Sequence, residues 1–594
     1  METNNEQFTC ISENYRYSKD GTLYYVEGKQ GKNGVVYEEC STIANHTPLL
    51  KEYRTIDNGI ETVEELVFNA LRNYSRGADT ILSLKNDVYS QTPNLKFGAA
   101  CRITLGRGAK SRYSEAMQIQ CENAPHAVIY QHTGYAHIDG ERVFLNGDFS
   151  IGKDGTTNKC NVSLPEQMKN YRFVERRDTE RFDTLLKMFP SVASNELVYS
   201  GLGLAFLTPL NALLRDIGIE PCFILYFTGK TGTRKTTMAK LILNFFGTYD
   251  NGTAPPASFR DTINAVELKF ALADSTLMLL DDRIPSTTPK IKAQMEAMEQ
   301  AVARQIGDRS GRARMNADGT LRATYRPNCN LIITAEESFS NVGESAIARS
   351  ISVELKPGDV DLQKLSEVQQ RATHLNQCMG DYIQWVISNW ESISEDAKSM
   401  FLEFRNKAQS GGHGRLAECV AHLQIGIVSM CKWLQHENII TDTEANAIKQ
   451  KSWDIFVTLA KAQNRRIVEE KPVKLFLDAI KEMRDRRTIN IYDLENPSQS
   501  SNINVIGYKD KDFYYLFPDS IYSEVKKFYI AQDKNYPLGK TALFHQLADD
   551  GIIEKDKDQN TKGKRILGKR YRMLWLRADA LNDNESEEEI TDGE

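Results

Sequence analysis

The sequence predicts a multidomain α/β protein whose centre is a parallel sheet covered by helices. Three short, continuous apolar runs support this prediction, at residues 222–227, 276–280 and 330–334. Runs of this length are typical of strands that are buried on both faces of a sheet. Helical patterns separate the runs, so we expect residues 196–360 to form the α/β core.

The composition is that of a soluble globular protein. The 594 residues exceed the size of one domain, and 41% are hydrophobic while 26% are charged. No apolar run reaches the roughly 18 residues of a membrane helix, and the polar N-terminus carries no signal peptide. Ten scattered cysteines without a C-x-x-C pair fit free thiols in a reducing compartment rather than zinc ligands. We therefore expect a cytoplasmic protein without a membrane partner.

Residues 1–195 are expected to form a β-rich N-terminal domain. β-branched and aromatic runs bounded by Gly and Asn recur along it. Asp139-Gly140, placed between apolar residues, indicates a hairpin. We expect two helices to interrupt the strands, at residues 61–74 and 113–122.

The part that follows the core is expected to be a helical region at residues 361–480 and a mixed domain at 481–580. In the mixed domain a short amphipathic helix at 540–547 stops at a glycine, and a basic loop and an alternating strand at 571–576 follow. This order is the outline of a winged helix. Residues 581–594 are acidic and polar and are expected to be a disordered tail.

A glycine-containing loop follows the first apolar run and precedes a helix. Its sequence, T-G-K-T-G-T-R-K-T-T, matches the P-loop pattern G-x-x-x-x-G-K-[S/T] at Gly229, Lys235 and Thr236. Backbone N–H groups and the helix N-terminus would form a cradle for the phosphates of ATP, with Gly232 and Thr237 in the same loop. Lys235 would reach the β- and γ-phosphates, and Thr236 would place its hydroxyl on Mg²⁺.

Arg234 stands where the pattern has its second glycine. Glycine is favoured there because it tolerates backbone angles that a Cβ disfavours. A non-glycine residue in such a conformation costs on the order of 1–3 kcal/mol. The alternative is a glycine-containing turn that precedes Lys-Thr-Thr by chance.

A second motif, L-M-L-L-D-D, ends an apolar strand in two carboxylates. Asp281 is the candidate to hold Mg²⁺, and Asp282 the candidate to polarise the attacking water. Thr334, at the tip of the third apolar run, is a candidate to orient that water. The alternatives are acids that cap the following segment and an ordinary strand end.

Two arginines are candidates to act on nucleotide. Arg349 precedes an amphipathic strand, the place where ring ATPases keep an arginine finger that stabilises charge on a neighbour's γ-phosphate. Arg415, after S-G-G-H-G, is a candidate second sensor. Either could instead be a surface arginine.

A basic hairpin is expected at residues 309–326, because Asp318-Gly319 lies between basic and apolar residues. Arg312, Arg314 and Arg322 would track a nucleic-acid backbone by charge in a ring pore. The alternatives are a solvated hairpin and one that contacts nucleotide at a subunit boundary.

The net charge of the chain is −6, yet its C-terminal part is locally basic. Lys562, Lys564 and Arg565 lie in the expected wing, and the helix at 540–547 takes the recognition-helix position. This arrangement suits phosphate contacts on duplex DNA. A winged helix used only for protein contacts is the alternative.

Together these motifs resemble a family of helicase-like ATPases from bacterial prophages and integrative elements, and the MCM-like replicative helicases of staphylococcal cassettes. The resemblance runs through much of residues 1–440. Relatives usually have Gly before the loop lysine and Asp-Glu in the second motif, so Arg234 and Asp282 depart from the family. The segments that carry the resemblance are 130–135, 138–140, the phosphate loop, 258–265 and 312–322.

The resemblance implies an AAA+ ring, a homo-oligomer and most often a hexamer, that hydrolyses ATP with Mg²⁺ to translocate on DNA and unwind it during replication of a mobile element. The first alternative is a nucleotide-switched DNA-binding or remodelling ATPase that does not unwind. A second is a structural protein with a decayed site. A primase is disfavoured, because no zinc cluster or acidic triad is assignable in the first 195 residues.

Overall fold

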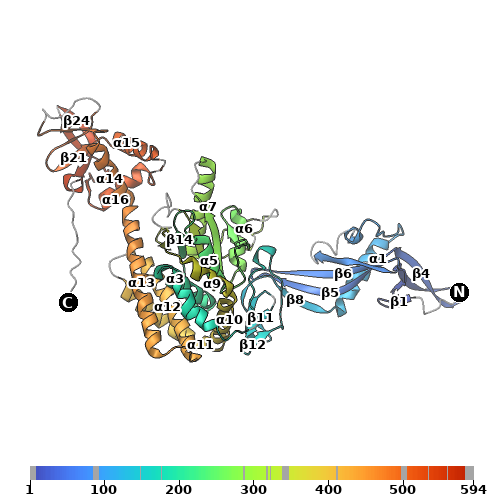
Figure 1. Cartoon of the computed structure of the whole chain (residues 1–594). Helices are drawn as coiled ribbons and strands as arrows, with labels where there is room; N and C mark the ends of the chain where they lie inside the picture. Colours follow the sequence, from blue (N-terminus) through green and yellow to red (C-terminus); the bar gives the residue numbers. More distant parts are fainter. Residues whose placement is uncertain are drawn as a thin grey trace.

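The protein is elongated in its computed structural model, with long N-terminal strands on one side of a central core and a C-terminal module at the tip of a long helix (Figure 1). The structure describes residues 8–83, 93–147, 149–175, 177–284, 288–315, 319–321, 323–336, 347–409, 413–496, 505–532, 534, 536–557, 559–566 and 568–581. The expected tail at 581–594 therefore lies outside the described residues except for Leu581.

Two sheets make up the outer N-terminal part. One has the order β1-β2-β3-β4, and the other has the order β13-β8-β5-β6-β7. Helix α1, Ala109–Ile119, packs its buried Tyr113 and Met117 into a small core with Leu66 and Phe68 of β6. The strands are β1 Phe8–Cys10, β2 Tyr15–Ser18, β3 Leu23–Gln30, β4 Val36–Ala44, β5 Thr47–Asp57, β6 Thr62–Arg72, β7 Ser75–Ser83, β8 His126–Tyr130 and β13 Asn161–Val162.

The helix predicted at residues 61–74 is wrong, because this segment is strand β6. It pairs with β5 on one side and with β7 on the other along most of its length. The helix predicted at 113–122 is confirmed as α1, which begins four residues earlier, and the strand at 126–130 is β8.

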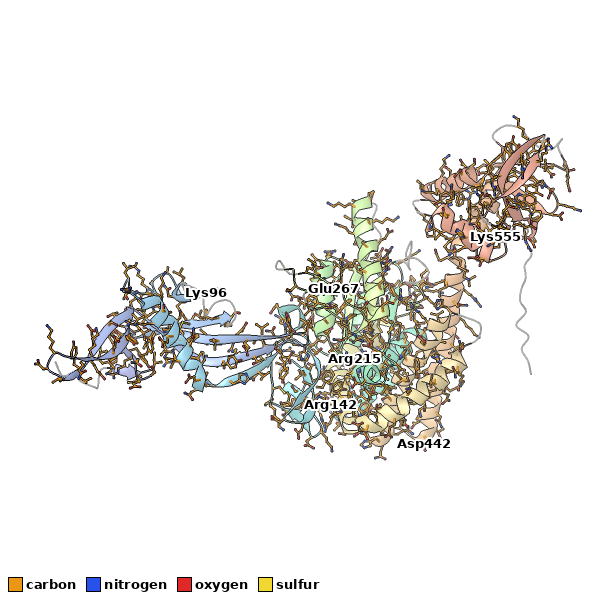
Figure 2. All side chains as sticks on the ribbon, turned by 180° about the vertical axis from the view of Figure 1, so that it is seen from behind. Lys96, Arg142, Arg215, Glu267, Asp442 and Lys555 are labelled. Atoms are coloured by element: carbon orange, nitrogen blue, oxygen red, sulfur yellow. The ribbon has the colours of Figure 1, made fainter. Side chains whose placement is uncertain are left out.

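A third sheet joins this part to the core. Its order is β12-β11-β10-β9, and the predicted hairpin at Asp139-Gly140 is confirmed, with both residues at positive φ. Arg142, labelled in Figure 2, lies at the joint, with its guanidinium 3.8 Å from the ring centroid of Trp390. The strands are β9 Gly134–Ile138, β10 Glu141–Asn146, β11 Phe149–Gly152 and β12 Gly155–Thr157.

At this joint the backbones of the N-terminal sheet and the core approach closely, because one of the residues is a glycine. A Cβ on Gly134 would lie 2.6 Å from the carbonyl oxygen of Asp274, too close for any other residue. Thr133 donates a backbone hydrogen bond to the carbonyl of Leu272 at 2.9 Å. The segment 130–135, which the sequence singled out, therefore fastens the N-terminal sheets to the core.

The predicted parallel sheet is confirmed at the centre of the molecule. Its order is β15-β16-β17-β14-β18, every neighbouring pair is parallel, and its residues are almost all buried. The elements are β14 Ile224–Thr228, α5 Lys235–Leu243, β15 Ala257–Ser258, α6 Ile263–Leu272, β16 Leu277–Arg283, α7 Pro289–Asp308, β17 Asn330–Ala335 and β18 Ser350–Glu354.

Helices before and after the sheet in the chain share its hydrophobic core. One cluster of buried residues runs from Phe144 to Ile467. Helix α13 begins at a capping box, in which Thr441 and Glu444 satisfy each other's backbone N–H groups. The helices are α2 Arg181–Asp183, α3 Asn195–Leu207, α4 Asn211–Asp216, α9 Leu362–Gln370, α10 Ala372–Ser388, α11 Trp390–Ala408, α12 Gly414–His436 and α13 Asp442–Glu469.

One helical segment, Asn195–Asp216, is long and apolar enough to cross a membrane by length and composition alone. Its most apolar window is entirely buried inside the protein. It packs against α12 and α13, so these side chains belong to the core.

The C-terminal module has a separate core, which runs from Val473 to Leu581. The helix predicted at 540–547 is α16, and β23 and β24 form the basic hairpin after it. The elements are α14 Pro472–Asp485, β19 Asn490–Asp493, β20 Val505–Lys509, β21 Phe513–Leu516, α15 Pro518–Ile530, α16 Lys540–Asp549, β22 Ile553–Glu554, β23 Lys562–Ile566 and β24 Lys569–Arg577.

Candidate nucleotide-binding site

The glycine-containing loop connects β14 to α5 at the carboxyl end of the central sheet. Ligands of open α/β sheets bind at this end. Gly229 has φ 146°, and a Cβ there would lie 2.3 Å from the carbonyl oxygen of Leu355. The position therefore requires glycine, and it lets the loop pass closely over the sheet.

Arg234 adopts the left-handed conformation, with φ 70° and ψ 22°, immediately before α5 begins at Lys235. This conformation costs an L-residue with a Cβ roughly 1–2 kcal/mol. The prediction that a glycine geometry is imposed on an arginine is confirmed. The loop keeps its form because the strand and the helix at its two ends are buried.

Lys235 turns back over the loop. Its Nζ donates to the carbonyl oxygen of Gly229 at 2.5 Å and to that of Lys230 at 3.0 Å. Partial burial lowers the pKa of this ammonium, while the carboxylates of Glu336 and Asp281 oppose that shift. The positive charge of Lys235 therefore lies among loop carbonyls and carboxylates, where a phosphate group would bind.

Asp281 lies between two hydroxyl groups. Its Oδ1 accepts a hydrogen bond from Thr236 Oγ1 at 2.7 Å and another from Thr334 Oγ1 at 2.5 Å. These residues come from β16, α5 and β17, three elements that meet at one edge of the sheet. Three residues predicted from separate motifs are thus brought into direct contact.

Asp282 occupies a bulge. Leu280 pairs with Ile333 and Arg283 with Ala335, so β16 has one residue more than β17 at this point. Asp282 has φ 71°, and its backbone N–H donates to Thr334 Oγ1 at 3.2 Å. Bulges re-aim side chains beside active sites. Here the bulge turns the carboxylate of Asp282 toward solvent, with 41% of the side chain exposed.

Lys235, Thr236, Asp282 and Thr334 line an open cleft of about 250 Å³. The buried Asp281 is bonded to two residues of that lining, Thr236 and Thr334. Two neighbours of the cleft were missed by sequence reasoning. Glu336 follows β17 and accepts a hydrogen bond from Thr231 of the loop, and the exposed Arg260 forms an ion pair with Asp282 at 3.2 Å. Arg260 lies in the segment 258–265, which the family resemblance had marked without assigning a role.

The residues of the cleft fit a nucleotide with Mg²⁺. A hydroxyl and a carboxylate side by side, as in Thr236 and Asp281, are the oxygen ligands that Mg²⁺ takes from a P-loop site, with phosphate and water supplying the others. The described residues contain no group of three or more His, Cys, Asp or Glu that could hold a metal alone. A metal here would therefore depend on phosphate oxygens.

Arg349 lies away from this cleft. Its carbonyl accepts a hydrogen bond from the N–H of Ile224, at the amino end of β14 and so opposite the phosphate loop. Its side chain is 10% exposed, pairs with Asp308 at 2.5 Å, and packs so closely on Gly307 that a Cβ there would clash. Arg349 does not reach the nucleotide cleft of its own subunit.

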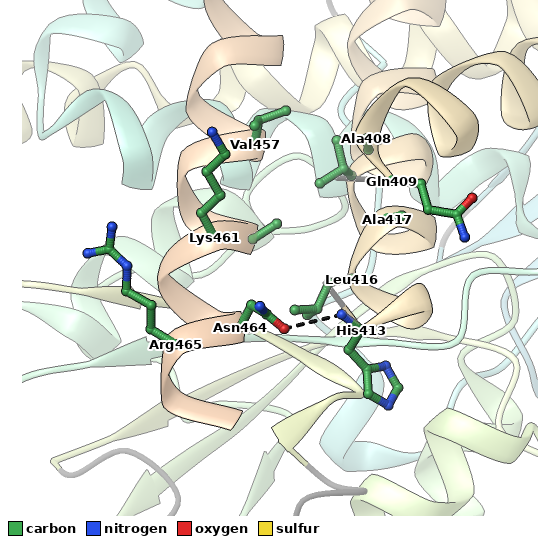
Figure 3. A pocket seen from close by; sticks show the side chains of 11 residues that line it. Ala408, Gln409, His413, Leu416, Ala417, Val457, Lys461, Asn464 and Arg465 are labelled. Carbon is green, nitrogen blue, oxygen red and sulfur yellow. Dashed lines mark hydrogen bonds between the residues drawn. The ribbon is translucent and has the colours of Figure 1, made fainter. Parts of the chain in front are cut away.

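Arg415 lines a different cavity, of about 620 Å³, which also contains Phe223 and Gly307 at the amino end of the sheet. It is likewise remote from the cleft of its own chain. A third, mainly apolar cavity of about 400 Å³ lies between α12 and α13, where the N–H of His413 donates to Asn464 (Figure 3). None of the phosphate-loop residues lines either cavity in the described part of the chain.

The predicted hairpin at 309–326 contains an antiparallel bridge between Met315 and Leu321, and both side chains are well exposed. Arg312 is exposed. Arg314 is held at the base, where it pairs with the buried Glu267, labelled in Figure 2. Arg322 lies outside the described residues.

Two lysines of the basic wing form ion pairs with acids of their own domain. Lys562 pairs with Glu554 at 2.7 Å and Lys564 pairs with Asp510 at 3.3 Å. Arg565 is exposed, and its Nε lies 3.5 Å from the carbonyl oxygen of Gly568. Of the three predicted DNA contacts, Arg565 is the most accessible.

Comparison with solved structures places this fold. The SCCmec type IV Cch active helicase matches with a TM-score of 0.59 and 14% sequence identity, over 96% of this chain and 99% of that one. The chain has a helicase-like ATPase fold similar to that of this cassette helicase, which confirms the predicted resemblance. A JCV helicase matches over 46% of this chain and 71% of that one, at 14% identity, but its TM-score of 0.20 supports no argument. No family model and no curated protein matches the sequence.

Proposed function

We propose that the protein is an ATP-dependent DNA helicase of a mobile genetic element or prophage. The observation that carries the proposal is the convergence of Thr236, Asp281 and Thr334 beside Lys235, on a fold shared with a cassette helicase. Convergence of a P-loop with an acid at the end of a neighbouring strand is the arrangement of nucleoside triphosphate hydrolysis.

Within the cleft each side chain has a distinct role. Lys235 leaves the loop carbonyls and binds the β- and γ-phosphates, while the N-terminus of α5 contributes its N–H groups. Thr236 and Asp281 hold Mg²⁺, which neutralises charge on the phosphates when bound. Thr334 fixes Asp281 and, with Asp282, positions the attacking water. Gly229, Gly232 and Thr237 shape and complete the loop.

DNA binding and assembly belong to the same proposal. In a homo-oligomeric ring, most often a hexamer, Arg349 and Arg415 would act from a neighbouring subunit. Both lie away from the cleft of their own chain, and in a head-to-tail ring a different surface of the neighbouring subunit meets that cleft. Arg349 would first have to leave its pair with Asp308. Arg312, Arg314 and Arg322 would face the pore, and Lys562, Lys564 and Arg565 would contact duplex phosphates. We expect a cytoplasmic location and no membrane partner.

The ion pair between Arg260 and Asp282 favours one alternative. An arginine paired with Asp282 occupies the place where that carboxylate would position a water, so the ATPase would be a switch that remodels DNA complexes without unwinding. Arg260 would then release Asp282 only in a particular state of the assembly.

The test is steady-state ATP hydrolysis with and without single-stranded DNA, followed by unwinding of a forked substrate. Lys235→Ala should lower turnover at least about a hundredfold, since it removes a preorganised contact to the transferred phosphoryl group. Lys230→Ala, a loop lysine outside the pattern, is the matched control and should retain turnover.

DNA-stimulated turnover with unwinding supports the helicase. Turnover that ignores DNA, without unwinding, supports the switch. A folded chain without any turnover would contradict both and would leave the decayed site as the explanation.

A further inference from the structure

The sheet of the C-terminal module carries a row of aromatic rings. Tyr492, Tyr508, Tyr515 and Trp575 lie on β19, β20, β21 and β24, one ring on each of four neighbouring strands. They are direct partners in the strand registers, Tyr492 with Tyr508, Tyr508 with Tyr515, and Tyr515 with Trp575. Directly paired residues point to the same face of a sheet, so the four rings share one face.

The opposite face is the one that holds the helices. Tyr514, Leu516, Leu574 and Leu576 alternate with the ring-bearing positions and belong to the core formed with α14, α15 and α16. The apolar side chains that gather on the ring face come, among the described residues, only from strands and adjoining loops. Tyr515 is buried at the centre of the row, while Tyr508 and Trp575 remain partly exposed.

Cations lie over these rings. The Nζ of Lys564 is 3.9 Å from the ring centroid of Tyr515 and 5.2 Å from that of Trp575, and the Nζ of Lys562 is 4.5 Å from that of Trp575. Both lysines also pair with acids, Asp510 and Glu554. These ring faces therefore lie within reach of cations on the neighbouring strand.

The strands that carry these lysines are strongly basic. Residues 562–577 contain seven Lys or Arg and no Asp or Glu, in a chain whose net charge is −6. Those residues are Lys562, Lys564, Arg565, Lys569, Arg570, Arg572 and Arg577. Of these, Lys562, Lys564 and Lys569 pair with residues of the ring-face cluster, so stacking surfaces and phosphate contacts lie on one face.

We propose that this face binds a single strand of nucleic acid, with bases stacked on Trp575 and Tyr508 and phosphates held by the basic strands. The rings of Tyr515 and Trp575 meet edge to face, with centroids 4.9 Å apart and an interplanar angle of 84°. A duplex keeps its base faces inside the stack, so it cannot use the rings. Single strands stack on aromatic side chains in this way without sequence preference. Lys562 and Lys564 move from the rings to the phosphates.

This inference extends the proposed function, and rests on it only for the choice of nucleic acid as ligand. It assigns the C-terminal module to the separated strand, in addition to duplex contacts made by the wing. The module lies at the end of α13, away from the nucleotide cleft (Figure 1), so substitutions can change this face and the nucleotide site separately.

The experiment measures anisotropy of a labelled oligothymidine, and of the corresponding duplex, with the full chain in the absence of nucleotide. Trp575→Ala with Tyr508→Ala should weaken binding of the single strand at least about thirtyfold, from the loss of two stacked bases. Tyr74→Ala, which removes a ring that is 77% exposed in the N-terminal part, is the matched control and should bind like the native chain.

Two further variants keep the test independent of misfolding. Trp575→Phe retains a ring, so it should bind normally while quenching of tryptophan fluorescence by the oligonucleotide is lost. Lys562→Gln with Lys564→Gln should weaken binding, whereas Lys526→Gln with Lys527→Gln on α15 should not.

Unchanged binding of the single strand by Trp575→Ala with Tyr508→Ala would overturn the proposal, as would an equal loss for duplex. The nucleotide site is read separately through Lys235→Ala. Loss of turnover in that variant with intact strand binding supports the proposal. If the native chain binds the single strand but never hydrolyses ATP, the strand-binding face is supported and the helicase function is contradicted.

Discussion

At the scale of the residue, the nucleotide cleft contains two non-glycine residues whose backbone has the left-handed conformation that favours glycine. Arg234 has φ 70° and Asp282 has φ 71°. Arg234 stands where the P-loop pattern has glycine, and each of the two lies next to a residue that would bind Mg²⁺ or phosphate. Such strain persists only where the surroundings enforce it, here because buried strands and helix α5 fix the ends of both segments.

Replacing Arg234 tests what its side chain does. Arg234→Gly should stabilise the protein by up to about 1 kcal/mol, because relief of the left-handed strain exceeds the added flexibility of glycine in the unfolded chain. Urea unfolding measures this, and ATP turnover should be kept or raised. Arg487→Gly, at another arginine with positive φ (56°) in the C-terminal module, should give a similar gain without altering turnover. A tenfold loss of turnover in Arg234→Gly alone would mean that the guanidinium acts on nucleotide.

At the scale of the element, the sequence predicts secondary structure best for strands that are buried on both faces. Strands β14, β16 and β17 are apolar along their whole length, so the prediction of a parallel sheet was correct. Strand β6 has apolar residues at helical spacing, including Val63, Leu66, Val67 and Ala70, and was predicted as a helix. Both its edges pair with long strands, and this tertiary context overrides local spacing.

In the nucleotide cleft, too, some features could be predicted from the sequence and others could not. The contacts of Asp281 with Thr236 and Thr334 follow from strand order, because residues that end neighbouring parallel strands meet at one edge. The bulge at Asp282, the pairing with Arg260 and the burial of Arg349 depend on loop geometry and on packing against α7. No spacing in the sequence encodes those features.

The strand that bears the acids is tied to α7 by a buried ion pair. Arg283 Nε donates to Glu299 Oε2 at 3.0 Å, with side-chain exposures of 5% and 0%. Burial raises the pKa of Glu299, and the neighbouring Arg283 opposes that shift. Because α7 leads into the basic hairpin, this pair connects the nucleotide cleft with the predicted DNA contacts.

Glu299→Ala should destabilise the core by about 3 kcal/mol or more, since it leaves Arg283 buried without its partner. Replacing both, Arg283→Met with Glu299→Met, should be far milder, because two apolar side chains of similar length fill the space. Glu524→Ala, which breaks an exposed pair with Lys527, should cost no more than about 1 kcal/mol. Denaturant unfolding gives all three values, and equal losses for Glu299→Ala and Glu524→Ala would refute the argument.

At the scale of the whole molecule, stability depends on buried histidines that stay neutral. Burial lowers the pKa of His422, in the central core, to about 4, and that of His46, in the N-terminal part, to about 4. His422 donates through Nε2 to the carbonyl of Ile219 at 2.8 Å. The unfolded chain takes up protons near pH 6.5, before the folded chain does, so stability is complete above that pH and is lost as the pH falls toward 4.

Near pH 5 each such histidine should lower the free energy of unfolding by about 2 kcal/mol relative to neutral pH. Urea unfolding followed by tryptophan fluorescence should show the loss in the native chain and a smaller one in His422→Gln. His436→Gln, at an exposed histidine on the same helix, is the control and should keep the native dependence. An unchanged pH dependence in His422→Gln would exclude this histidine as a cause.

Helix α13 spans 28 residues, and two residues, Glu470 and Lys471, separate it from α14. At a rise of 1.5 Å per residue the helix is about 42 Å long. Because the connector is so short, a tilt of α13 would carry the C-terminal module with it. A tilt of about 5° at its base would swing the far end by about 4 Å, close to the spacing of adjacent strands. A small tilt of α13 against α3 and α12 would thus displace the aromatic face by about one base along a bound strand.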